Sequence, residues 1–414
     1  MLLSWLGAAF GLRAAERIAV SFAVLLFFWG AFALIAAGTG RAPWKLAPLI
    51  AVFTYGWTFE TGLMNYYISL GLCFFALAAF LRFGNRGRLL SLALIPVIWL
   101  AHPLGVMCLA GLATYAAAAK AMQPSHHRYL LLVTGILLFG LRIFLERRYE
   151  VKWNTLGRYF FFNGADQLIL YSDRYYLLYL LFAALLVAAL ATAVSGSWRE
   201  GSFWETSGIP VQLYLATGIA SILLPTTVVF PQYPEALSFL TPRLSSVSGI
   251  LACWMLSTMK PRRWLVLGCA VLAAGFFTFL HVDTGILNNR EERVERTLAG
   301  LPAGHRVVSD IAVGEPSRMV IGHIVDRGCI GRCFSYDNYE PPSELFRVRA
   351  APGNSIVYVP DKSEPAAESV KAGAKALEPP VFEISQCGRS TVNICARELS
   401  PDEMSALLQG KFEF

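Results

Sequence analysis

Two ionisable side chains stand alone within long apolar stretches of the sequence. Glu60 is the only charged residue from Leu46 to Leu81, and His102 lies in the uncharged stretch Leu89–Ala119. A carboxylate or an imidazole held near a membrane surface can act as a general base or hold a metal–phosphate group. Both also have structural interpretations, Glu60 as a solvated group at a helix end and His102 as a cap on a kinked helix. We take both as candidate catalytic residues.

Three further polar residues, Asn65, Tyr66 and Arg243, are candidates for substrate binding. Asn65 and Tyr66 follow Glu60 closely, and Arg243 ends a later loop. Asn65 has an alternative interpretation as a polar contact between packed helices. The sequence contains no P-loop, GxGxxG, HExxH or GxSxG motif of the soluble enzymes. We assign no metal-binding residues, and a divalent cation is a candidate cofactor only.

The composition places these candidates in a membrane protein. The 414 residues are 56% hydrophobic and 15% charged, whereas soluble domains are about 25% charged. Residues 1–280 carry 20 Lys or Arg and 9 Asp or Glu, and residues 281–414 carry 15 and 19. The excess of positive charge therefore belongs to the apolar part, with the lipid bilayer as its partner. No basic cluster interleaved with aromatic residues lies in the polar part, which argues against nucleic-acid binding.

Helix lengths define the expected membrane spans. About 20 apolar residues cross a hydrocarbon core of about 30 Å. Leu46–Leu81 would reach about 54 Å as one helix, so we expect two helices that meet near Thr58–Gly62. Leu89–Ala119 would reach about 46 Å, and its central His102-Pro103 allows either two short passes or one kinked helix. Further spans are expected at Ile18–Ala37, Tyr129–Leu145, Tyr175–Val194, Ile209–Phe230, Ser245–Met259 and Trp264–Leu280.

Loop charges favour two passes at Leu89–Ala119 and about ten transmembrane helices in total. With ten passes, one set of alternate loops holds Arg41, Lys45, Arg82, Arg86, Arg88, Lys120, Arg128, Arg199, Lys260, Arg262 and Arg263, whereas the opposite short loops hold only Arg243. Basic loops face the cytoplasm, so we predict an α-helical polytopic protein of the inner (plasma) membrane. Residues 1–17 are then an external juxtamembrane segment, 18–280 the multi-span domain and 281–414 an extracytoplasmic domain.

The C-terminal domain is expected to be a small α/β domain. Its sequence predicts strands at His305–Ala312, Ser355–Pro360, Val381–Gln386 and Val392–Ala396, and helices at Asn289–Leu301, Glu364–Leu377 and Pro401–Leu408.

Four of the eight cysteines lie in this domain: Cys329, Cys333, Cys387 and Cys395. In an oxidising compartment they favour two disulfides, in any of three connectivities. Cys387–Cys395 would close a hairpin, and Cys329–Cys333 would close a tight loop. Free thiols and a metal site are the alternatives, although neither spacing matches that of common zinc sites.

Short motifs along the chain resemble those of GT-C-type integral membrane glycosyltransferases, most closely poorly characterised bacterial members. The motifs are Gly62-Leu63-Met64-Asn65-Tyr66 and Leu100-Ala101-His102-Pro103, each followed by an apolar helix, together with Ala15-Glu16-Arg17 and Arg243-Leu244-Ser245. With the hydropathy pattern, the resemblance covers most of the chain.

The resemblance implies transfer of a sugar from a polyprenyl-phosphate carrier to an acceptor at the external membrane face. In that family the catalytic carboxylate lies in the first external loop, after a first span. Here Ala15-Glu16-Arg17 resembles the helix that leads into the family's second span, so the first span and its loop are expected to be missing. The chain is then either truncated or a non-catalytic relative. Glu16 and Glu60 are the nearest substitutes for the missing carboxylate.

A non-enzymatic function is the alternative from another class. A transporter, a flippase-like protein or a component of envelope assembly would need a polar path between helices broken by Gly or Pro. The prolines Pro96, Pro103, Pro210 and Pro225 are compatible with such breaks.

Overall fold

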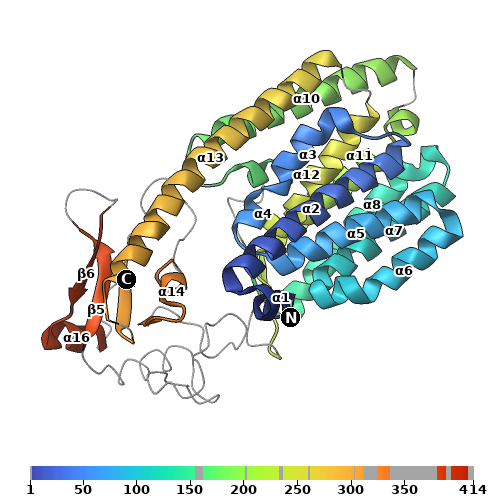
Figure 1. Ribbon diagram of the computed structural model, residues 1–414. Coiled ribbons are helices and arrows are strands. Elements are labelled where there is room, and N and C mark those ends of the chain that lie inside the picture. Colours follow the sequence, from blue (N-terminus) through green and yellow to red (C-terminus); the bar gives the residue numbers. More distant parts are fainter. Residues whose placement is uncertain are drawn as a thin grey trace. The chain divides into compact units, whose positions relative to one another are not determined.

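The computed structural model describes residues 2–153, 162–200, 203–232, 236–259, 262–302, 304–311, 324–335, 380–387 and 393–408. The chain is mostly helical and divides into two compact units, Met1–Phe279 and Leu280–Phe414 (Figure 1).

The first unit is a bundle of apolar helices. Among the residues that the structure describes, its helices of eight residues or more are α1 (Leu2–Phe10), α2 (Leu12–Thr39), α3 (Ala47–Thr54), α5 (Met64–Arg82), α6 (Gly84–Ala101), α7 (Pro103–Ala121), α8 (His127–Arg148), α10 (Tyr175–Glu200), α11 (Phe203–Leu223), α12 (Leu240–Thr258) and the start of α13 (Arg263–Ala299). Within the described ranges, six helices are long and apolar enough to cross a membrane: Arg13–Thr39, Met64–Arg82, Pro103–Ala121, Pro124–Arg148, Tyr175–Thr192 and Arg263–Ala299. This agrees with the predicted class of helical membrane protein.

The helix break expected near Thr58–Gly62 is confirmed. The short helix α4 (Trp57–Glu60) lies between α3 and α5. The segment before the break is shorter than expected, because α3 has eight residues and a length of only about 12 Å. Gly56 interrupts it with an extended backbone at the N-terminus of α4.

The stretch Leu89–Ala119 forms two helices that fold back on each other, and not one kinked helix. His102 has an extended backbone between α6 and α7, and its side chain accepts a hydrogen bond from the Leu104 N–H. Arg88 near the start of α6 and Thr114 near the end of α7 line the same cavity. A continuous helix would hold these two residues about 39 Å apart.

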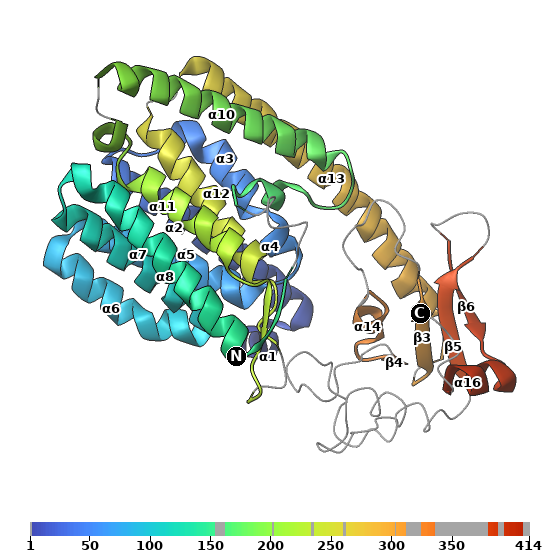
Figure 2. The same cartoon turned by 180° about the vertical axis from the view of Figure 1, so that it is seen from behind.

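Helices α2 and α5 pack with their backbones in contact. A Cβ atom on Gly30 would lie 2.4 Å from the Gly71 carbonyl oxygen, and one on Gly71 would lie 3.0 Å from backbone atoms of Leu26. Small residues allow this close approach, which is typical of helix pairs inside membranes. Figure 1 shows α2, α5 and α6 side by side, and Figure 2 shows α6 at the edge of the bundle again when it is viewed from behind.

The N-terminal residues 2–17 form α1 and the first turns of α2. Glu16 thus belongs to the helix that continues into the first apolar span, and its side chain is half-buried.

The second unit contains a four-stranded sheet. Its strands are β3 (Arg306–Asp310), β4 (Phe334–Ser335), β5 (Val381–Gln386) and β6 (Ile394–Glu398), in the order β4-β3-β5-β6. Strand β3 is parallel to β4 and β5, and β6 is antiparallel to β5. Successive residues of β3 face different cores. Val307 packs with Val294 of α13 and Val325 of α14 (Ile324–Cys329), whereas Val308 packs with Met404 of α16 (Pro401–Leu408).

The predicted strand and helix at Val381–Gln386 and Pro401–Leu408 are confirmed, and both disulfides form. Cys329 bonds to Cys333 and Cys387 to Cys395. The helix expected at Asn289–Leu301 is the end of α13, which continues unbroken from Arg263. The predicted strand Ser355–Pro360 and helix Glu364–Leu377 lie outside the described residues.

Candidate functional site

A buried polar network joins three segments of the first unit that are far apart in the sequence. The segments are α4, the short helix η3 (Ala165–Leu168) and the start of α12. Gln167 is at the centre. Its Oε1 accepts hydrogen bonds from the Thr58 N–H at 3.0 Å and from the Thr58 hydroxyl at 2.8 Å. Its Nε2 donates to the Pro242 carbonyl oxygen at 3.1 Å. Gln167 therefore fixes the start of α12 against the helix break that carries Glu60.

Asp166 is a buried carboxyl within this network. The Ser245 hydroxyl donates to its Oδ1, and the Gln167 amide donates to its Oδ2 at 3.0 Å. Burial raises the pKa of Asp166 to about 7, and these hydrogen bonds oppose the rise without cancelling it. Because both carboxyl oxygens are occupied, Asp166 is suited to position α12.

The Asp166 carboxyl should make stability depend on pH. Its pKa rises from 3.8 to about 7 on folding, so the native state keeps a proton that the unfolded chain releases. Stability should therefore fall as pH rises through this window, by roughly 4 kcal/mol. Asp166→Asn carries no charge, can accept from the Gln167 amide through Oδ1 and donate to the Ser245 hydroxyl through Nδ2, and should abolish this dependence. Unfolding in mixed detergent micelles, followed by circular dichroism at pH values on either side of the window, measures the effect. An equal pH dependence in the variant would contradict the assignment.

Glu60 differs from Asp166 because only one of its two carboxyl oxygens accepts a hydrogen bond from a described residue. The Tyr171 hydroxyl donates to Glu60 Oε2, whereas no described residue donates to Oε1. The carboxyl is half-buried, and burial raises its pKa while the Tyr171 hydrogen bond opposes the rise. A partly accessible carboxylate with a raised pKa and one free oxygen can accept a proton from a bound hydroxyl group.

Arg243 is a buried cation with no carboxylate partner among the described residues. Its side chain is 9% exposed, and the buried Nε atom makes no hydrogen bond. The guanidinium lies over the Tyr66 ring, 5.5 Å from the ring centroid, and the Tyr66 hydroxyl donates to the Arg243 carbonyl oxygen at 2.8 Å. A cation–π contact compensates only part of the cost of burying a charge. The Arg243 guanidinium is therefore suited to bind an anion.

His102 completes this cation site. Its ring packs edge-on against Tyr66 with the centroids 5.7 Å apart, and its Nε2 lies 3.5 Å from Arg243 Nη1. Burial, together with the Arg243 charge, lowers the pKa of His102 to about 4, so the ring is neutral at neutral pH.

The single proton of the neutral His102 ring lies on Nε2. Nδ1 accepts a hydrogen bond from the Leu104 N–H at 3.2 Å, which excludes a proton on Nδ1. The Nε2–H and the Arg243 guanidinium are then two donors facing each other, and neither satisfies the other. An anionic oxygen beside them would accept from both.

The structure brings together three of the predicted site residues, Tyr66, His102 and Arg243. Glu60 lies two residues after Thr58 of the adjoining network, and its own hydrogen bond is with Tyr171. Asn65 is exposed at the start of α5, and Glu16 lies on α2, outside the residues that these hydrogen bonds connect. Sequence reasoning missed the functions of four residues: Asp166, Gln167, Tyr171 and Ser245. In the sequence, Asp166 was visible only as one of four acidic residues in the long loop 146–174.

Within the described ranges, no three His, Cys, Asp or Glu side chains are grouped so that they could hold a metal ion.

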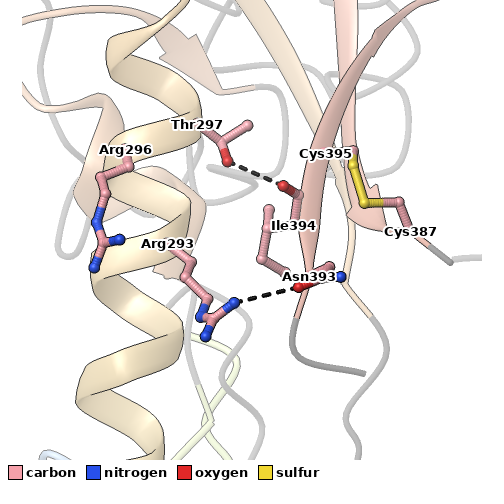
Figure 3. Close-up of a pocket in the computed structure, with 7 residues that line it drawn as sticks. All are labelled: Arg293, Arg296, Thr297, Cys387, Asn393, Ile394 and Cys395. Carbon is pink, nitrogen blue, oxygen red and sulfur yellow. Dashed lines mark hydrogen bonds between the residues drawn. A yellow bond between two sulfur atoms is a disulfide. The ribbon is translucent and has the colours of Figure 1, made fainter. Parts of the chain in front are cut away.

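The second unit has a separate surface pocket of about 330 Å³ between α13 and β6 (Figure 3). Arg293 Nη1 donates to Asn393 Oδ1 at 3.3 Å, and the Thr297 hydroxyl donates to the Ile394 carbonyl oxygen at 3.2 Å. The Cys387–Cys395 disulfide forms part of its wall. Arg296 at the rim pairs with Glu292 at 2.9 Å. The polar groups of this pocket are thus largely satisfied, in contrast to those around Arg243.

Comparisons with protein-family models, with curated proteins and with solved structures found no match to this chain.

Proposed function

We propose that the protein is a membrane glycosyltransferase of GT-C type, which takes a sugar from a polyprenyl-phosphate carrier. The observation that carries the proposal is the buried guanidinium of Arg243, which has no carboxylate partner among the described residues and faces the Nε2–H of His102. Phosphate is the anion that such donors suit, because several charge-assisted hydrogen bonds can reach its oxygens. A polyprenyl tail would extend into the bilayer around the apolar helices.

Each residue has a distinct part in the proposed reaction. Glu60 accepts the proton from an acceptor hydroxyl, whose oxygen then bonds to the sugar carbon that bears the phosphate. The bond between that carbon and the phosphate oxygen breaks, and the lipid phosphate leaves with the electron pair. Arg243 and His102 stabilise its negative charge. Asp166 is a positioning residue, which acts through Ser245 and Gln167.

The membrane arrangement is part of the same proposal. We infer about ten passes, in which α3 is too short to cross the hydrocarbon core by itself and crosses together with α4. The basic loops then lie in the cytoplasm and residues 281–414 lie outside the inner (plasma) membrane. The loop charges support this orientation. It places Glu60, His102 and Arg243 at the external ends of their helices, where a lipid-linked sugar and its acceptor would meet.

Binding of a short polyprenyl phosphate tests the proposal. The full chain is purified into phosphatidylcholine nanodiscs and titrated with farnesyl phosphate or with uncharged farnesol. Farnesyl phosphate should bind at least about 100-fold more tightly, because two charge-assisted hydrogen bonds of about 1.5–3 kcal/mol each depend on the phosphate. Equal affinities would overturn the proposal. Phosphate-dependent binding without sugar transfer to any acceptor would instead favour a transporter, a flippase-like protein or an assembly component.

A further inference from the structure

A cavity in the first unit lies between α6 and α7. Its volume is about 320 Å³, and we call it the α6–α7 groove. Its lining is Phe80, Arg88, Ser91, Leu92, Ile95, Val106, Leu109, Ala110, Ala113 and Thr114. None of these residues belongs to the site around Arg243.

The sequence explains why a groove remains between these two helices. Gly87 holds α6 tightly against α5, since a Cβ atom there would lie 2.0 Å from the Ala79 carbonyl oxygen. The Ser91 hydroxyl adds a hydrogen bond to the Ala76 carbonyl oxygen at 2.7 Å. On the other side of α6, α7 lines the groove with Val106, Leu109, Ala110, Ala113 and Thr114, and the two alanines are the smallest of these residues. The small side chains leave space that larger ones would fill.

The groove has the shape and polarity of a hydrocarbon-chain site. From Arg88 to Ile95, α6 rises about 10 Å, so the groove is an elongated channel along the helix. Its lining is almost entirely apolar, and the hydroxyl of its Ser91 is already bonded within the protein. Leu92 is 60% exposed, as expected of a side chain in contact with lipid.

The polar end of the groove is cationic. Arg88 has only a long hydrogen bond of 3.4 Å to Asn85 Oδ1, and it forms no ion pair with any described residue. Arg82 ends α5, Arg86 lies in the first turn of α6 and Lys120 lies in the last turn of α7. All three therefore lie at the end of this helix group that also holds Arg88. The sequence contains no Asp or Glu from residue 61 to residue 145, so these three helices offer no carboxylate to neutralise the charge.

We propose that the α6–α7 groove binds an anionic phospholipid, with one acyl chain along the groove and the phosphate on Arg88. The apolar channel receives the chain, and the uncompensated cation at its end selects the negative headgroup. The basic ends of these helices are those inferred to face the cytoplasm, where anionic lipids are concentrated. The inference concerns a site distinct from the proposed transferase site and does not depend on it.

Native mass spectrometry of the full chain tests this lipid site. The protein is reconstituted in nanodiscs that hold equal amounts of phosphatidylglycerol and phosphatidylcholine, and the lipids retained after extraction are counted. Wild type should retain phosphatidylglycerol preferentially. Arg88→Gln should lower that preference about fivefold, as expected for one basic residue at an anionic membrane surface. Ala110→Trp should fill the groove and remove the retained lipid of either kind.

Matched variants outside the groove provide the controls. Arg128→Gln removes an exposed arginine at the start of α8, and Leu137→Trp enlarges a residue of α8 that is 68% exposed. Both should retain lipid as wild type does, and thermal unfolding should show that all four variants are folded. Unchanged retention in Arg88→Gln, or equal losses in Ala110→Trp and Leu137→Trp, would overturn the proposal. Displacement of phosphatidylglycerol by farnesyl phosphate would also overturn it, in favour of a prenyl-phosphate site.

Discussion

Arg243→Met should lower the affinity for farnesyl phosphate at least about 10-fold, because it removes the guanidinium's charge-assisted hydrogen bond to the phosphate while the His102 Nε2–H remains. It should not lower the stability of the ligand-free protein. Methionine retains much of the aliphatic volume, and the variant no longer buries a cation that lacks a carboxylate partner among the described residues. Equilibrium titration and detergent unfolding measure the two effects on the same preparation.

A loss of affinity without a loss of stability distinguishes a binding function of Arg243 from a structural one. Arg41→Gln is a suitable control, because Arg41 donates to the Ser257 carbonyl oxygen at 2.7 Å near the far end of α12. This variant should bind farnesyl phosphate as wild type does. If Arg243→Met lost stability and retained its affinity, Arg243 would be a packing residue.

Glu60→Gln should slow sugar transfer by about 10²–10⁴-fold, the usual contribution of a general base. Affinity for farnesyl phosphate should be unchanged, because Glu60 does not contact Arg243 or His102 in the described network. Glutamine can still accept the Tyr171 hydrogen bond, so the local fold should persist. A transfer assay from a polyprenyl-phosphate-linked sugar, with single-turnover kinetics, separates the chemical step from binding.

The pH dependence of transfer provides a further test of Glu60 as the base. Activity should rise with pH as Glu60 ionises, above the ordinary value of 4.5 because burial raises its pKa. Tyr171→Phe removes the hydrogen bond that favours the ionised form, so the rising limb should move to higher pH. If the transfer activity of the variant rose over the same pH range as that of wild type, another group, such as Asp166, would be the one that titrates.

Much of the architecture could be predicted because hydrocarbon imposes simple constraints. The break before Met64 followed from the length of Leu46–Leu81, and the two disulfides pair the cysteines that are nearest in sequence. The continuity of α13 was not foreseen. Polar residues after Leu280 indicated the end of a span, but a change of solvent does not by itself end a helix. No proline occurs from Arg263 to Ala299 to interrupt it.

The candidate site was predictable only in part, because its parts come from distant segments. Tyr66, His102 and Arg243 could each be singled out as polar residues among apolar ones, yet nothing in the sequence indicates that their side chains touch. Asp166 was visible only as one acidic residue in a long loop. Its burial arises from the packing of η3 against α12, which periodicity and composition do not encode.

The position of the phosphate is the most direct test of the account. A cryo-electron microscopy structure of the full chain in nanodiscs with farnesyl phosphate would locate it. We expect phosphate oxygens within hydrogen-bond distance of both the Arg243 guanidinium and His102 Nε2, with Tyr66 still under the guanidinium. A phosphate bound elsewhere, with Arg243 unoccupied or paired with the carboxylate of Glu60, would contradict the proposed function.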